Sequence, residues 1–264
     1  MPHEIKIGII GGSGLEDPAF IDDYSTTKVA TPYGDPSSDL ILGRIGDIPV
    51  AVISRHGKGH TINPTNVNYG ANIWSLKDQG CSHILATTAC GSLHDEIKPG
   101  NFVFPDQFID RTTKRITSFY NDASVQHVPM GTPFCAKTSA VLQDQAHKLG
   151  LSFHPKGTVV TIEGPRFSSR AESMLFKSWG CNIINMSTVP EVVLARELGM
   201  CYQNIAMSTD YDCWHESEEE VNIEMVFAVM AKNAETVKNL IRNTVPELSS
   251  EDCECRSFYR SVHG

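Results

Sequence analysis

The sequence IKIGIIGGSG at residues 5–14 places an apolar, β-branched run directly before a glycine-rich turn. A short run of isoleucines bounded by glycines predicts a buried strand, here over Ile5–Ile10. The same order of strand, small-residue junction and helix recurs along the chain, with a glycine after most of the helical segments. This alternation predicts an α/β fold with a mixed or mostly parallel central sheet flanked by helices.

The expected elements follow from hydrophobic periodicity and from their Gly, Pro, Asp or Asn boundaries. Strands are expected at Ile5–Ile10, Leu40–Ile45, Val50–Ser54, His83–Thr88, Phe102–Phe104, Thr158–Ile162, Ile183–Met186 and Ile205–Ser208. Helices are expected at Ala71–Gln79, Lys137–Leu149, Ser169–Trp179, Pro190–Leu198 and Glu224–Asn243. In the last helix, Val226, Val229, Met230, Val237, Leu240 and Ile241 form an apolar stripe that we assign to the core.

Length and charge restrict the function classes. The chain has 264 residues, which suits one domain over 1–264, with a C-terminal tail of about 249–264 that matches no motif. A net charge of −9 argues against nucleic acid or an anionic membrane as partner. Residues 1–14 show no basic segment before a long apolar run, so we expect no secretory signal and a location in the cytoplasm, with the nucleus as an alternative.

The eight cysteines then suit a reducing compartment. Six are scattered, and we interpret them as small core residues: Cys81, Cys90, Cys135, Cys181, Cys201 and Cys213. Cys253 and Cys255 form an isolated CxC pair near the C-terminus. A zinc site needs two further close ligands, which the sequence does not supply for this pair, so we expect no metal; a reactive or redox pair is the alternative.

Two junctions suggest an anion site. The pattern G-x-x-G-G-x-G at Gly8–Gly14 differs from a dinucleotide fingerprint, but its amides and the Ser13 hydroxyl suit an oxyanion; a turn without a ligand is the alternative. Residues 54–60, SRHGKGH, follow a strand. There Arg55 can grip an anion with two hydrogen bonds and His56 can donate to it, unless this is only a solvated basic turn. His60 alone is easily explained as solvated.

Four further junctions carry hydroxyl groups or acids. They lie at residues 86–92 (ATTACGS), 161–170 (TIEGPRFSSR), 185–191 (NMSTVPE) and 208–212 (STDYD). Either Ser168 or Ser169 can cap the helix that follows them. Together with Arg55, the hydroxyls can hold a tetrahedral anion, while Asp210 and Asp212 can accept hydrogen bonds or protonate a leaving group. No spacing suggests a covalent nucleophile or a Walker lysine.

These motifs resemble the purine nucleoside phosphorylase superfamily. GIIGGSG, RHG, TTACGS, TIEGPRFSSRAE, NMSTVPEVVLARE and STDYDCW carry the resemblance, which runs from about Ile5 to about Thr244. Within the superfamily they are most similar to the eukaryotic 5'-methylthioadenosine phosphorylases. The resemblance implies phosphorolysis of 5'-methylthioadenosine to adenine and 5-methylthioribose 1-phosphate, in purine and methionine salvage. It also implies a single-domain phosphorylase fold, no cofactor besides the co-substrate phosphate, and a homotrimer.

The resemblance also implies residue roles. The phosphate-binding residues would be Ser13, Arg55, His56, Thr88, Ala89 and Ser187, with Ser168 near the same site. The nucleoside would contact Met186, Phe167, His60, Asp210 and Asp212, with Asp210 as the catalytic acid. Ile223 and Val221 would line the pocket for the 5' substituent, which Ser168 would help to select, and His127 would come from a neighbouring subunit.

Base selectivity also follows from hydrogen-bond chemistry. An ionised carboxylate accepts from the N6–H of adenine but cannot donate to a 6-oxo group, so the two acids favour a 6-aminopurine. Ile223 and Val221 offer no partner to a 5'-hydroxyl, which favours a 5'-methylthio group. A phosphorylase for 6-oxopurine nucleosides or methylthioinosine is the alternative enzyme. A non-catalytic binding protein and a dinucleotide oxidoreductase are the alternatives from other classes.

Overall fold

The computed structural model describes residues 5–12, 15, 18–120, 125–215, 223–249 and 253–263. Among them, strands are β1 (Ile7–Gly11), β2 (Asp22–Thr27), β3 (Leu40–Ile45), β4 (Ile48–Ser54), β5 (His83–Ser92), β6 (Phe102–Val103), β7 (Gln107–Arg111), β8 (Phe153–His154), β9 (Thr158–Ile162), β10 (Ile183–Asn185) and β11 (Cys201–Asp210). Helices are α1 (Tyr69–Asp78), α2 (Ala136–Lys148), α3 (Arg170–Ser178), α4 (Thr188–Glu197), α5 (Ile223–Thr244) and α6 (Ser257–His263).

The strands form one mixed sheet, as expected. Its main path is β2-β3-β4-β1-β5-β10-β9-β7, and β11 joins it beside β5. The central pairs β1–β4, β1–β5 and β5–β11 are parallel, whereas β10 runs antiparallel to β5. All ten residues of β11 are buried, because the sheet is covered on both faces there.

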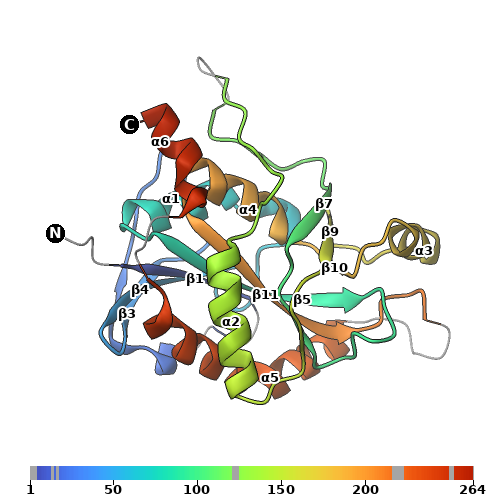
Figure 1. Ribbon diagram of the computed structural model, residues 1–264. Coiled ribbons are helices and arrows are strands. Elements are labelled where there is room, and N and C mark those ends of the chain that lie inside the picture. Colours follow the sequence, from blue (N-terminus) through green and yellow to red (C-terminus); the bar gives the residue numbers. More distant parts are fainter. Residues whose placement is uncertain are drawn as a thin grey trace.

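Helices cover the two faces of the sheet with separate apolar clusters (Figure 1). One cluster contains Ile73 and Leu76 of α1 and Val192 of α4. The other contains Leu142 of α2 and Leu240 of α5. The stripe on α5 is core, as expected, at Met230, Val237, Leu240 and Ile241, whereas Val226 and Val229 are only half-buried. Val226 and Met230 have a second role described below. No helix in the described ranges is both long and apolar enough to cross a bilayer.

Strands β5 and β11 extend beyond their expected ends. We expected a turn of small residues after Thr88, but β5 continues to Ser92 because it pairs with β11 on one side and β10 on the other. Gly91 makes this possible, since a Cβ there would lie 3.0 Å from Asp210 Oδ1. The two parallel strands consequently end at the same edge of the sheet, with Asp210 opposite Gly91.

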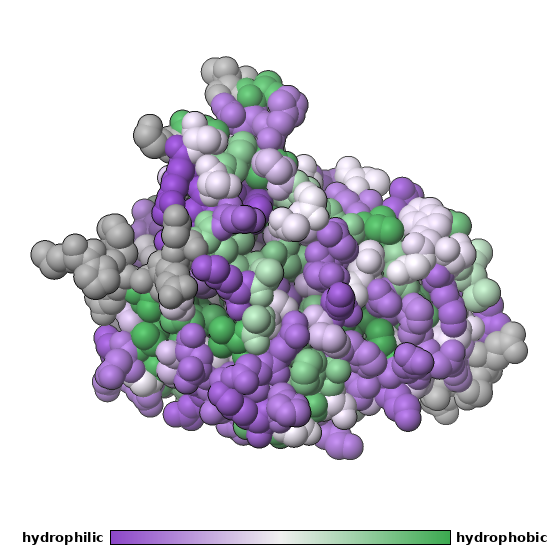
Figure 2. Space-filling model, in the orientation of Figure 1, coloured by the Kyte–Doolittle hydropathy of each residue, from purple (hydrophilic) through white to green (hydrophobic). Residues whose placement is uncertain are grey.

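Short polar elements were not expected from the sequence. Strand β2 is mostly exposed and β7 has no fully buried residue, so neither carries the apolar alternation that marks a strand. The segment between β7 and α2 projects as a lobe from a mostly hydrophilic surface (Figure 1, Figure 2). It is anchored where Glu163 accepts hydrogen bonds from the Lys114 amide at 2.9 Å and from Arg115 Nε at 3.1 Å.

Candidate active site

One cavity lies where the carboxyl ends of β4, β5, β10 and β11 meet the first turns of α5. The cavity and its open mouth enclose about 840 Å³. Eleven of the residues singled out from the sequence line it: Arg55, His56, His60, Thr88, Ala89, Phe167, Ser168, Met186, Ser187, Asp210 and Asp212. Ser13 and Val221 fall outside the described residues, as does the side chain of Ile223 at the start of α5.

Arg55 directly follows β4 and is 1% exposed. Its Nε donates to Glu191 Oε1 at 2.5 Å and one Nη donates to Glu191 Oε2 at 3.0 Å. The other Nη donates to the Thr87 carbonyl at 2.8 Å. Burial acts to lower the pKa of Arg55, but the Glu191 carboxylate outweighs it, and the net pKa is raised. Arg55 is therefore a fixed cation, with two of its five N–H groups left for a ligand.

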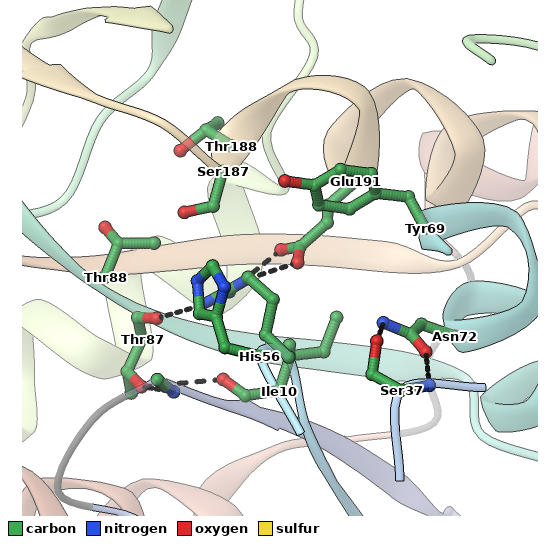
Figure 3. A network of polar contacts seen from close by, with 12 residues as sticks. Ile10, Ser37, His56, Tyr69, Asn72, Thr87, Thr88, Ser187, Thr188 and Glu191 are labelled. Carbon is green, nitrogen blue, oxygen red and sulfur yellow. Dashed lines mark hydrogen bonds and ion pairs between the residues drawn. The ribbon is translucent and has the colours of Figure 1, made fainter. Parts of the chain in front are cut away.

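No role was predicted for Glu191, although it lies in the 185–191 segment that was predicted to border the site. It is fully buried in the first turn of α4 and also accepts from the Tyr202 hydroxyl at 2.8 Å. Figure 3 shows its carboxylate held by dashed contacts beside His56, with Ser187 and Thr88 on the opposite side. Glu191 thus accepts the two parallel hydrogen bonds, from Nε and one Nη of Arg55, that we expected Arg55 to donate to an anion. The signal that could have revealed it is an acid in the first turn of a helix that starts at a strand end.

His56 takes a different role from the expected one. Its Nδ1 lies 2.8 Å from the Ile62 carbonyl, which can only accept, so Nδ1 carries the proton. Burial, followed by the Arg55 charge, lowers the pKa of His56 to about 3. The neutral ring consequently leaves Nε2 as an acceptor. His56 can therefore accept a hydrogen bond from an anion that carries an O–H group, rather than donate to it.

Two hydroxyl groups, from Thr88 in β5 and from Ser187 after β10, line the cavity together with Arg55. Thr88 Oγ1 donates to Asn204 Oδ1 at 3.0 Å, within a buried network that includes Asn185. Ser187 occupies the N-cap position of α4, yet its hydroxyl makes no capping hydrogen bond. The Ser187 hydroxyl is therefore available to a ligand in the cavity, which this residue lines.

The two serines before α3 divide their roles. Ser169 caps α3 in a capping box with Glu172, whose amide donates to Ser169 Oγ at 3.3 Å. Ser168 lines the cavity instead, and its buried Oγ contacts no hydrogen-bonding partner among the described residues. Nearby, Gly164 adopts φ +68°, which favours glycine. A Cβ at this position would lie 2.6 Å from Met186 Sδ, so only glycine leaves room for the Met186 side chain.

Two carboxyl groups lie on another part of the cavity wall. Asp210 accepts from the Thr209 hydroxyl at 2.7 Å and from the Asp212 amide at 2.8 Å. Burial raises the pKa of Asp210, and burial raises that of Asp212 to about 6. Neither carboxyl has an ion pair in the part of the chain described. This region therefore favours a ligand with N–H donors or a basic ring nitrogen.

The wall formed by α5 is apolar. Val226, Phe227 and Met230 line the cavity, and Phe227 packs edge-on against His60 with ring centroids 5.4 Å apart. Val226 and Met230 were expected in the core, and no role was predicted for Phe227. His127, by contrast, is exposed and does not line the cavity of its own chain.

These features define a phosphorylase of nucleoside type, and the comparisons agree with the expectation from the motifs. The sequence profile of the phosphorylase superfamily matches residues 6–246. The chain belongs to this superfamily. A dinucleotide fold is excluded as well, because the first long helix described after β1 is α1, which follows β4.

Several similar relatives fall in one group within this superfamily. A Danio rerio protein named S-methyl-5'-thioadenosine phosphorylase is 54% identical over 253 residues, which cover 94% of this chain and 90% of the relative. The Drosophila melanogaster protein of that name is 50% identical over 256 residues, 95% and 89% of the two chains. Methylthioadenosine phosphorylase from Schistosoma mansoni in complex with adenine superposes with a TM-score of 0.90, at 43% identity over 94% and 93% of the chains. A variant of the adenosine/methylthioadenosine phosphorylase from that organism, solved with methylthioadenosine, gives the same TM-score at 42% identity over 94% and 93% of the chains.

Proposed function

We propose that this chain is a 5'-methylthioadenosine phosphorylase, acting as one domain on methylthioadenosine and inorganic phosphate. The observation that carries this is the division of one cavity into a cationic, hydroxyl-lined region around Arg55 and a region with two buried carboxyl groups. The relatives named above support the choice of nucleoside, because they carry this activity in their names or hold methylthioadenosine or adenine.

Phosphate would bind in the region around Arg55. Two N–H groups of Arg55 and the Ser187 hydroxyl would donate to its oxygens, together with Ser13 and the backbone at Ala89. Thr88 lines the same region, and its hydroxyl would donate to phosphate by turning its proton away from Asn204 Oδ1. Neutral His56 would accept from the O–H of hydrogen phosphate. Because Glu191 already balances Arg55, the cation stays in place when the site is empty and adds little net charge to a buried wall.

Adenine would face the two acids, with Phe167 beside the ring. An ionised Asp212 would accept from N6–H, and Asp210, whose pKa burial raises, would carry the proton that N7 needs. Met186 would lie behind the ribose. His60 and the apolar residues of α5 would surround the 5' substituent, where a methylthio group gains from burial and a hydroxyl would lack a partner.

The reaction forms one bond and breaks one. The C1'–N9 bond breaks with its electron pair going to the purine, while Asp210 gives a proton to N7. An oxygen of phosphate attacks C1' and becomes the oxygen of 5-methylthioribose 1-phosphate. The proton of hydrogen phosphate balances the one that adenine carries away, so no cofactor is required. The close anion also offsets the positive charge that develops on the ribose.

We also propose a homotrimer in the cytoplasm. The cavity is open, and Phe167 and Phe227 at its wall are 37% and 38% exposed, which suits closure by a neighbouring subunit. His127 on the exposed lobe is our candidate for the residue supplied to the neighbour. Each of the eight cysteines is a free thiol, which suits a reducing compartment.

The test compares nucleosides with and without phosphate. The proposal predicts adenine release from methylthioadenosine only when phosphate is present, with much lower kcat/KM for methylthioinosine. Size-exclusion chromatography with light scattering reports the subunit number. Faster phosphorolysis of methylthioinosine than of methylthioadenosine would contradict the proposed base selectivity and favour the 6-oxopurine enzyme.

A further inference from the structure

Four cysteines from three separate parts of the chain converge on the side of the molecule that carries α6. Cys135 precedes α2, Cys201 begins β11, and Cys253 and Cys255 precede α6. The Sγ atoms of all four lie within 4.8 Å of one another. The expectation that the CxC pair lacks two further close ligands is therefore wrong, because the fold supplies Cys135 and Cys201.

The spacing of these sulfurs fits one metal ion. Zinc–sulfur bonds of about 2.3 Å in a tetrahedron place neighbouring sulfurs about 3.8 Å apart. The Sγ atoms of Cys135 and Cys253 are 3.7 Å apart. Two disulfides would instead bring the sulfurs together in pairs at about 2.05 Å. All four cysteines are free thiols and form one compact group, so their arrangement matches a common centre rather than two pairs.

The backbones of Cys135 and Cys201 are held in place by hydrogen bonds that do not involve the C-terminal segment. The Cys135 amide donates to the Tyr202 carbonyl at 2.9 Å, and the Cys201 amide donates to the Ser82 carbonyl at 3.0 Å. Both thiols are at most 1% exposed. Cys135 and Cys201 therefore form a fixed pair at the start of β11, and Cys253 and Cys255 of the C-terminal segment supply the other two sulfurs.

The surroundings suit thiolates. The Thr138 amide in the first turn of α2 donates to Cys135 Sγ at 3.5 Å, as backbone amides do to metal-bound sulfur. The N-terminus of this 13-residue helix carries positive partial charge. Lys137 lines the adjoining recess, and Arg256 follows Cys255 directly. These groups oppose the double negative charge that four thiolates and one Zn²⁺ would leave.

We propose that Cys135, Cys201, Cys253 and Cys255 bind one Zn²⁺ in a closed structural site. On binding, each thiol loses its proton to solvent and its sulfur bonds the metal, with no change in oxidation state. The site joins the C-terminal segment to β11 and α2. It shares no residue with the substrate cavity, so its role is in stability rather than in phosphorolysis.

Metal analysis of the full chain tests this. The protein is purified without a metal-affinity tag, reduced with a phosphine, incubated with ZnCl₂ and desalted. We expect about one zinc per chain in the wild type and in Cys181→Ala, which removes a buried cysteine from another cluster. We expect essentially none in Cys253→Ser. No zinc in the wild type, or equal zinc in wild type and Cys253→Ser, would overturn the proposal.

A measurement on the wild type alone covers the case in which Cys253→Ser does not fold. Loading with Co²⁺ in place of Zn²⁺ is expected to give thiolate-to-metal charge-transfer bands and the intense visible bands of tetrahedral cobalt. Metal loading is also expected to protect four of the eight cysteines from alkylation and to raise Tm, with the initial phosphorolysis rate unchanged. Octahedral cobalt spectra, or disulfides joining these cysteines in freshly purified protein, would contradict it.

Discussion

The two ends of the cavity, which we propose to bind phosphate and the purine base, differ in how their charged groups are paired. At the phosphate end, Arg55 is buried with Glu191 as its partner, and His56 is held neutral. At the base end, Asp210 and Asp212 are buried near each other without a cation among the described residues, and burial raises both pKa values. The charge at the first end is balanced by an ion pair within the protein. The carboxyl groups at the second end would find their hydrogen-bond donors in the bound ligand.

This difference indicates how one site can bind a dianion and also protonate a leaving group. A paired cation costs less to bury and presents its remaining N–H groups in a fixed direction. Burial makes unpaired carboxyl groups hold protons more tightly than carboxyl groups in water, and this raised pKa suits Asp210 to the proposed role of proton donor to the purine.

Removing the partner of Arg55 should have the largest effect. Glu191→Ala leaves a buried guanidinium without its counter-ion, so we expect a loss of about 3–5 kcal/mol in the free energy of unfolding. The KM for phosphate should also rise, because Arg55 is no longer held in place. Glu197→Ala is the matched control, since this acid of the same helix is also buried but accepts from Ser118 and Phe119 rather than from a cation. Equal stability losses by urea unfolding in the two variants would contradict the special role of the ion pair.

Removing the acid at the base end should affect turnover rather than stability. We expect Asp210→Asn to lower kcat/KM for methylthioadenosine by at least about 10²-fold, because N7 loses its proton donor. The KM for phosphate should change little. Asp106→Asn is the control, since Asp106 lies outside the cavity and accepts from the Gly157 amide. Unchanged kinetics in Asp210→Asn would show that this carboxyl is only structural.

The pH profile should show the raised pKa of Asp212. Below pH about 6 this carboxyl gains a proton and can no longer accept from N6–H, so kcat/KM for methylthioadenosine should fall up to about tenfold per pH unit. The proton is bound more tightly in the folded state, so this group favours folding as pH falls from about 6 towards 4. Asp212→Asn should lack this acidic limb at saturating phosphate. An identical limb in both enzymes would assign it to another group, such as phosphate itself.

The smallest effect is expected on the choice of 5' substituent. Ile223→His introduces a donor at the start of α5, so the ratio of kcat/KM for adenosine over methylthioadenosine should rise by about tenfold, the value of one hydrogen bond. Glu235→His on the exposed face of the same helix is the control. A ratio that moves equally in both variants, or in neither, would place Ile223 outside the 5' pocket.

Most of the sheet and the residue types of the site could be predicted from the sequence. Strands rich in apolar residues, such as β3 and β9, were placed with the observed ends. The polar strand β2 and the extension of β5 beyond Thr88 depend on pairing with distant strands, and no local pattern records that pairing. The same limit explains Glu191, whose partner lies 136 residues away.

The sequence predicted which residues belong to the site better than it predicted the direction of their hydrogen bonds or the surface that each side chain contacts. The sequence placed His56 at the anion, but only the Ile62 carbonyl shows which nitrogen carries the proton. Val226 and Met230 were correctly predicted as apolar helix positions, yet that stripe borders both the core and the cavity. The CxC pair was judged without its spatial neighbours, which join it only in the folded chain.

In the proposed reaction, phosphate at one end of the cavity attacks the ribose whose purine is held at the other end. Phosphate labelled with ¹⁸O distinguishes this reaction from hydrolysis, by mass spectrometry of the sugar product together with a count of the adenine released. We expect one labelled 5-methylthioribose 1-phosphate, with label in its C1–O bond, for each adenine. Free 5-methylthioribose, or adenine release at full rate without phosphate, would instead indicate a hydrolase.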